Sequence, residues 1–76
     1  MVELLTYLAK QLVDEPDAVR VEEVEEDDAI VLRLTVAPAD IGKVIGRQGR
    51  IARALRQVMR AAGTGNRRRI LLEIVE

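Results

Sequence analysis

The chain contains no Cys, His, Ser, Trp or Phe, and Tyr7 is its only aromatic residue. Without cysteine there is no disulfide framework and no thiolate metal site. Without His, Cys or Ser, the usual nucleophile–base pairs of enzymes cannot be assembled, so we expect no catalytic activity and no cofactor. One tyrosine also cannot form the aromatic platform on which some RNA-binding sheets stack bases. These absences favour a binding domain over an enzyme.

Long apolar runs are absent as well. No stretch approaches the roughly 20 apolar residues of a membrane span, and the beginning of the chain does not resemble a signal peptide. We therefore expect a cytoplasmic protein without membrane or small-molecule partners. The 76 residues are 49% hydrophobic and 33% charged, which is enough for one small core and argues against disorder. The sequence predicts a single domain over residues 1–76.

The charge is divided unevenly between the two halves. Residues 1–40 carry 3 basic and 11 acidic side chains, whereas residues 41–76 carry 9 basic and 2 acidic ones. No carboxylate lies between Ile41 and Leu72, and eight of the nine basic residues there are Arg, whose planar fork suits phosphate. The asymmetry indicates an anionic partner for the basic half. The alternative is a solvated surface whose two sides neutralise each other.

The apolar pattern predicts six elements in the order helix, strand, strand, helix, helix, strand. A helix ends before Pro16, and Val24 lies out of phase with Val19 and Val21, which predicts a bulge near Glu22–Glu23 or the end of that strand. The other expected segments are an acidic turn at 25–28, a central strand at 30–36, helices at 38–45 and 50–62, a loop at 63–66 and a last strand at 68–75. We expect an α+β, two-layer fold with the helices on one face of the sheet.

The helix over residues 50–62 is predicted to be amphipathic. At about 100° per residue, one stripe contains Ile51, Leu55, Val58, Met59 and Ala62, and the other contains Arg53, Arg56 and Arg60. The Arg stripe has no Glu or Asp at the i±4 positions that usually stabilise a solvated charged helix. This favours a polyanion partner, although an ordinary amphipathic helix stays an alternative.

The preceding tetrapeptide, Gly46-Arg47-Gln48-Gly49, predicts a sharp turn between two helices. The free N–H groups at the start of the next helix attract an anion, and Arg47 and Arg50 add positive charge there. The segment therefore predicts a phosphodiester site. The alternative is a connection that needs glycine only for its geometry.

Together these segments resemble a known family. Val44-Ile45-Gly46-Arg47-Gln48-Gly49 and the following Arg50-Ile51-Ala52-Arg53-Ala54-Leu55 resemble the KH domain, in which a GxxG loop joins two helices and clamps about four nucleotides. The extra helix and strand before them resemble the type II arrangement. Essentially the whole chain resembles the small bacterial single-KH RNA-binding proteins of the KhpA family. Many KH domains carry a large apolar residue where this chain has Ala52, and the helical phase favours Ile51 as the core residue.

The resemblance implies a three-stranded mixed sheet with two parallel core strands, and single-stranded RNA as the ligand. It also implies a homodimer and a second KH-containing protein as partners. Gly46, Arg47, Gln48 and Gly49 form the implied clamp, with Ile41, Val44, Ile45 and Leu71 under the bases; Val44 and Ile45 have a plain core role as an alternative. We expect phosphate contacts from Arg47, Arg50 and Lys43, extended by Arg53, Arg56 and Arg60.

We therefore expect a non-catalytic RNA-binding protein that acts as a small RNA chaperone or regulator. The runner-up is a protein–protein module in which the basic helix or the acidic 22–28 hairpin docks an oppositely charged protein.

Overall fold

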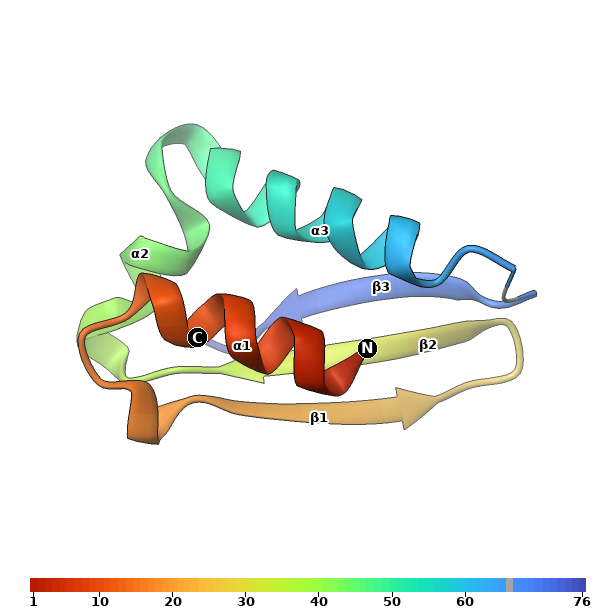
Figure 1. The fold of residues 1–76 in the computed structure, drawn as a ribbon, viewed down its shortest axis with the longest axis horizontal. Coiled ribbons are helices and arrows are strands. Elements are labelled where there is room, and N and C mark those ends of the chain that lie inside the picture. The colour runs from red at the N-terminus through yellow and green to blue at the C-terminus, as the bar shows by residue number, and fades with distance from the viewer. Residues whose placement is uncertain (66) are drawn as a thin grey trace.

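The computed structural model describes residues 1–65 and 67–76 of the chain. The elements follow the predicted order (Figure 1). They are α1 (Val2–Leu12), β1 (Arg20–Glu25), β2 (Ala29–Thr35), α2 (Ile41–Ile45), α3 (Arg50–Ala62) and β3 (Arg69–Ile74), with short 3-10 turns at Pro16–Ala18, Pro38–Asp40 and Arg47–Gly49. None of the described helices has the length and apolar character needed to cross a bilayer.

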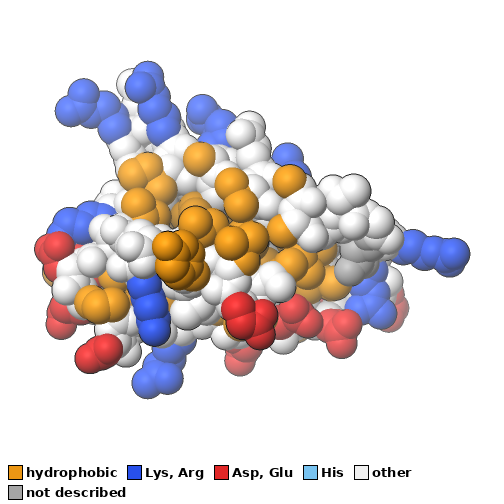
Figure 2. Space-filling view, in the orientation of Figure 1, with side chains coloured by type: hydrophobic (Ala, Val, Ile, Leu, Met, Phe, Trp, Pro, Cys, Tyr) orange, Lys and Arg blue, Asp and Glu red, His pale blue; other side chains and the backbone are white. Residues whose placement is uncertain are grey.

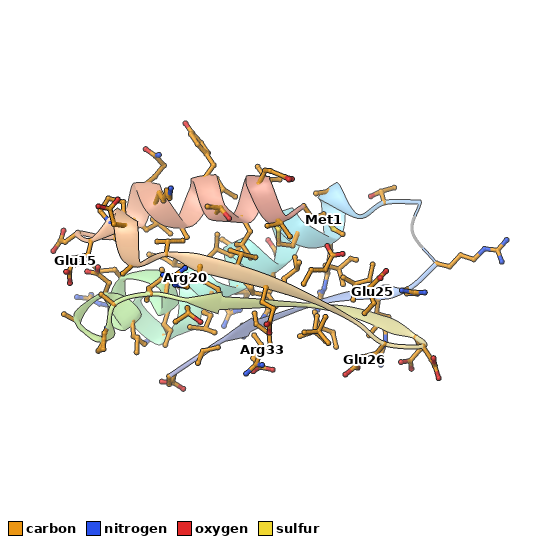
Figure 3. All side chains as sticks on the ribbon, turned by 90° about the horizontal axis from the view of Figure 1, so that it is seen from below. Met1, Glu15, Arg20, Glu25, Glu26 and Arg33 are labelled. Carbon is orange, nitrogen blue, oxygen red and sulfur yellow. The ribbon has the colours of Figure 1, made fainter. Side chains whose placement is uncertain are left out.

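The sheet is mixed, with the strand order β1-β2-β3. β1 and β2 form an antiparallel hairpin, and β2 and β3 run parallel, joined by α2 and α3. The helices lie on one face of the sheet (Figure 1). Seen from below, α1 covers one side while Arg33 points to the other, where no described helix lies (Figure 3). The predicted α+β architecture is confirmed.

The predicted irregularity near Glu22–Glu23 is wrong. β1 is continuous from Arg20 to Glu25 and pairs residue for residue with β2, from Arg20↔Thr35 to Glu25↔Ile30. Because side chains alternate along a strand, Val21 shares the covered face with Leu34, while Val24 lies opposite Val31 on the uncovered face. Val24 is therefore out of phase because it packs on the outer face of the sheet, as does Leu71, which pairs with Val31 from the other side.

The core lies between the sheet and the helices. It contains Leu5 and Ala9 from α1, Leu55 and Met59 from α3, and the covered faces of β2 and β3. The central cluster of buried apolar side chains contains Leu5, Ala9, Val19, Ile30, Leu32, Leu34, Val36, Val44, Leu55, Met59, Ile70 and Leu72, and Ala29, Ala37 and Ala52 are buried as well. At roughly 25 cal/mol per Å² of buried apolar surface, this burial is the main stabilising term for so small a chain.

The rotation of α3 about its axis differs from the predicted one. Ala52 occupies the core with 3% of its surface exposed, whereas Ile51 is only half-buried and Val58 is 40% exposed. The predicted core stripe of α3 was therefore wrong in its orientation: Ile51 and Val58 face the side of α1, and Ala52 faces the sheet. At the end of α3, the Gly63 N–H donates to the Met59 carbonyl at 3.0 Å and closes the last turn of the helix. Asn66, placed in the predicted loop, lies outside the described residues.

Candidate nucleic-acid interface

The predicted turn connects α2 to α3 through three residues with positive φ. α2 ends at Gly46 (φ 77°), whose N–H donates to the Gly42 carbonyl at 2.8 Å. Gln48 (φ 58°) and Gly49 (φ 74°) follow in the left-handed region, and the Gly49 N–H donates to the Gly46 carbonyl at 3.2 Å. The chain therefore reverses within four residues and presents its backbone at a corner of the molecule.

Gly46 is required by a close approach as well as by its backbone angles. A Cβ built on Gly46 would lie 2.6 Å from Ile51 Cγ1 and 2.9 Å from the Ile51 nitrogen. Only glycine lets the first turn of α3 pack this closely on the end of α2. Because Ile51 packs against Gly46 at the turn, Ala52 takes the core position at the start of α3.

Gln48 is the single non-glycine residue with positive φ among those described. Side chains other than Gly, Asn and Asp seldom adopt this conformation, and it marks local strain of about 1 kcal/mol or more. Both Arg47 and Gln48 have exposed side chains, and Gly46 and Gly49 are partly exposed. The tip of the turn is therefore open to solvent on its Arg47–Gln48 side.

α3 starts directly after this turn without a side-chain cap. Its N-cap is Gly49, no side chain accepts a hydrogen bond from its first turn, and that turn contains no acidic residue. The first N–H groups of a helix lack intrahelical acceptors, and its dipole places partial positive charge there. Because α3 is 13 residues long, its dipole is fully developed.

Five arginines extend from the turn along the exposed side of α3. Across residues 1–65 and 67–76, none of them makes an ion pair: Arg47, Arg50, Arg53, Arg56 and Arg60. In the space-filling view, Lys and Arg side chains project along the upper edge of the molecule where α3 lies (Figure 2). We call these five residues the arginine row. Five like charges without ion-pair partners among the described residues, next to an uncapped helix start, form a site that fits a polyanion.

Arg68 and Arg69, at the start of β3, are ion-paired with the acidic hairpin. Arg68 pairs with Glu25 at 2.9 Å, and Arg69 lies 3.9 Å from Asp28. On the uncovered face, Arg33 lies 3.5 Å from Glu22 and 3.2 Å from Glu73. The acidic hairpin is thus partly neutralised by the chain's own arginines, which weakens the runner-up interpretation of it as a docking surface.

Lys43, predicted to contact phosphate, is bound to carboxylates instead. Its ammonium donates to Asp14 and, at 3.3 Å, to Asp40. The hydrogen bond to Asp14, followed by that to Asp40, raises the pKa of Lys43. Burial alone would raise the pKa of Asp40, but hydrogen bonds from the Asp14 and Glu15 N–H groups and from Lys43 outweigh it, and the pKa is lowered. Lys43 is therefore not freely available to phosphate in this structure.

The predicted apolar floor is only partly at the surface. Val44 has no exposed surface and belongs to the core, so its alternative role is the one observed and it cannot contact RNA. Ile41 and Ile45 are half-buried beside the turn. Leu71 is 38% exposed, but it lines a cavity of about 290 Å³ with Arg60, Arg69 and Ile70, near the opposite end of α3 from the turn.

Two features of the site were missed at the level of sequence. The first is the contact of Lys43 with Asp14, which joins residues 29 positions apart and has no local signal. The second is an apolar groove of about 350 Å³ between α1 and α3, which we call the α1–α3 groove. It is lined by Leu8, Gln11, Leu12, Arg50, Ile51, Ala54, Leu55 and Val58. The sequence does carry a signal for this groove, because the apolar stripes of α1 and α3 are both wider than the part of each helix that the core buries.

A family model and individual relatives both match this chain over nearly its whole length. The family model described as the KH domain of KhpA/KhpB matches residues 2–74. The chain is 52% identical over 75 residues to RNA-binding protein KhpA of Clostridium acetobutylicum, with 99% of this chain and 100% of the relative covered. It is 50% identical over 74 residues to RNA-binding protein KhpA of Aquifex aeolicus, with 97% and 94% covered. No solved structure gives a significant match.

Proposed function

The chain belongs to the KhpA/KhpB family of KH domains, and we propose that it binds a short single-stranded RNA segment at the Gly46–Gly49 turn without catalysing a reaction. The matched relatives carry the name RNA-binding protein and no enzyme name. The observation that carries the proposal is the exposed turn at the uncapped start of α3, next to an arginine row that makes no ion pair within the described part of the chain.

In the proposed complex, phosphates lie at the exposed Arg47–Gln48 tip of the turn and against the N–H groups of the first turn of α3. Arg47 and Arg50 contact these phosphates, and Arg53, Arg56 and Arg60 extend the positive field over about 15 Å of helix at about 1.5 Å per residue. Bases lie on the apolar surface of Ile41 and Ile45. Because apolar contact discriminates poorly between bases, sequence selectivity is weak. A role as a small RNA chaperone or regulator agrees with weak selectivity.

We extend the proposal to a single KH domain over residues 1–76 that forms a homodimer and also pairs with a second KH-containing protein. One domain that contacts a few phosphates binds RNA weakly, at about micromolar Kd or above at physiological salt. Linking two such sites raises the overall affinity without new contacts. The α1–α3 groove supports this extension because it is an apolar surface that adjoins the turn at Arg50 and Ile51 but does not include Arg47 or Gln48.

The test replaces the two exposed residues of the turn. R47D/Q48D places two carboxylates where the proposal places phosphate, and should reduce RNA binding in an anisotropy titration by at least about tenfold. R20D/T64D makes the same total change of charge at exposed positions on β1 and in the loop after α3, outside both the turn and the α1–α3 groove, and should retain most of the affinity. Circular dichroism checks that both variants fold. Unchanged RNA affinity in R47D/Q48D would show that the turn is not the binding site.

A further inference from the structure

Lys43 differs from every member of the arginine row. In the α2–turn–α3 segment, as far as the structure describes it, Lys43 is the one basic residue that makes an ion pair. It also lies three residues before Gly46, on the short helix that leads directly into the turn. A cation that belongs by position to the proposed phosphate site is thus held by carboxylates.

The two carboxylates that hold Lys43 have different surroundings. Asp40 is 1% exposed and accepts the Glu15 N–H at 3.0 Å, so it is built into the junction between the end of α1 and the start of α2. Asp14 is 77% exposed, and no other hydrogen bond or ion pair of its side chain is present among the described residues. The Lys43 side chain itself is 43% exposed. One partner is therefore fixed, and the other lies at the surface.

Exposed ion pairs are weak because both charges remain solvated and the side chains lose freedom on pairing. A phosphate held at the turn would be surrounded by Arg47, Arg50 and the amides of α3, and so would add its own attraction to that of the site. Lys43 can then exchange the Asp14 carboxylate for phosphate and keep its bond to the buried Asp40. The exchange needs only rotation of a flexible, half-exposed side chain.

We propose that Asp14 sets the RNA affinity of the turn by competing with RNA phosphate for Lys43. This inference rests on the proposed function. It assigns a role in RNA binding to a carboxylate that does not belong to the basic segment. It also explains how Lys43 can be a phosphate ligand in the complex while it is ion-paired in the free protein.

The first experiment compares D14N with D17N in RNA titrations by anisotropy. Both variants remove one negative charge, and Asp17 is an exposed residue of the adjacent Pro16–Ala18 turn that makes no ion pair within residues 1–65 and 67–76. D14N should bind RNA about two- to fivefold more tightly than D17N, the range expected for one exposed ion pair. In a K43Q background the difference between the two variants should disappear.

A second measurement uses the wild-type protein, so it does not depend on whether a variant folds. In the wild-type protein, the carboxyl carbon of Asp14 is followed by NMR during addition of a short single-stranded RNA. Its chemical shift should change at saturation as Lys43 leaves, while that of Asp17 should stay nearly constant.

Equal affinity of D14N and D17N, tighter binding by D17N, or an Asp14 signal that RNA does not change would each overturn the inference. Loss of binding in R47D/Q48D would leave the proposed function standing in all three cases. If the wild-type protein binds no single-stranded RNA at all, the proposed function itself fails.

Discussion

At the scale of single residues, Gly46 shows most directly how the sequence determines the site. Its angles, φ 77° and ψ 173°, lie in a region that essentially only glycine adopts. The absent Cβ also admits Ile51. Both requirements follow from the position of the residue between two helices, so a glycine-bracketed tetrapeptide could be recognised from sequence without knowledge of distant contacts.

Gly46→Ala should therefore destabilise the protein strongly. The added methyl group would lie 2.9 Å from the Ile51 backbone nitrogen, which cannot move without shifting the start of α3. We expect a loss of about 2–4 kcal/mol in the free energy of unfolding, from backbone strain and overpacking together. Urea denaturation followed by circular dichroism measures it.

Gly42→Ala provides the matched control on the same short helix. Gly42 has ordinary helical angles, and a Cβ there meets no atom within 4 Å. The change should be neutral or stabilising by up to about 1 kcal/mol. If both substitutions had equal effects, the close packing of Gly46 against Ile51 would not be the reason for glycine at that position.

At the scale of elements, the link between α1 and α2 depends on one buried carboxylate. α2 has five residues, too few to be stable as an isolated helix. Val44 fixes it to the core, and Asp40 joins its start to the Asp14–Glu15 segment that follows α1. The position of the Gly46–Gly49 turn therefore depends on contacts made at both ends of α2.

This link predicts a pH dependence with two limits. The pKa of Asp40 lies below its ordinary value of 3.8, so its contribution to stability is present above pH 3.8 and is lost as the pH falls through the lowered pKa. The pKa of Lys43 lies above 10.5, so its contribution is present below pH 10.5 and is lost as the pH rises through the raised pKa. Urea midpoints measured across both ranges test this expectation.

The variant D40N separates this effect from general acid unfolding. It should unfold at lower urea than the wild type near neutral pH, and its stability should fall less steeply between about pH 4 and pH 2. D17N should follow the wild-type curve, since Asp17 is exposed. An acid limb of the same slope in D40N and the wild type would contradict a role for Asp40.

The elements also show where prediction from sequence stopped. Periodicity was sufficient for the order, type and approximate bounds of every helix and strand, because alternation and helical spacing are local properties. It was insufficient for the rotation of α3, which is set by the contact of Ile51 with Gly46, and for Val24, whose apolar neighbours lie on the uncovered face. The partners of Lys43 depend on how α1 and α2 meet in space, which no local pattern records.

At the scale of the whole molecule, charge and apolar surface are separated. The arginine row follows one edge, acidic side chains gather along the opposite edge, and an apolar patch lies between them (Figure 2). The patch includes the α1–α3 groove, with Val58 40% exposed, and the exposed α1 residues Leu4 and Tyr7. A second copy seated on this patch would bury it and leave the tips of both turns free for one RNA.

Val58→Asp should therefore convert a dimer into a monomer. A carboxylate in an apolar interface would be desolvated without a partner, which is costly enough to prevent association. Light scattering should give about twice the 8.5 kDa chain mass for the wild type and about 8.5 kDa for V58D. L71D, which changes a side chain of similar exposure on the other face of the sheet, should retain the dimer mass.

The affinity of V58D for an RNA long enough to reach both turns should fall, while its affinity for a four-nucleotide RNA should stay the same, because only the longer RNA gains from two linked sites. A wild-type protein that remains monomeric at high concentration, or a V58D variant with the dimer mass, would exclude the α1–α3 groove as the dimer surface.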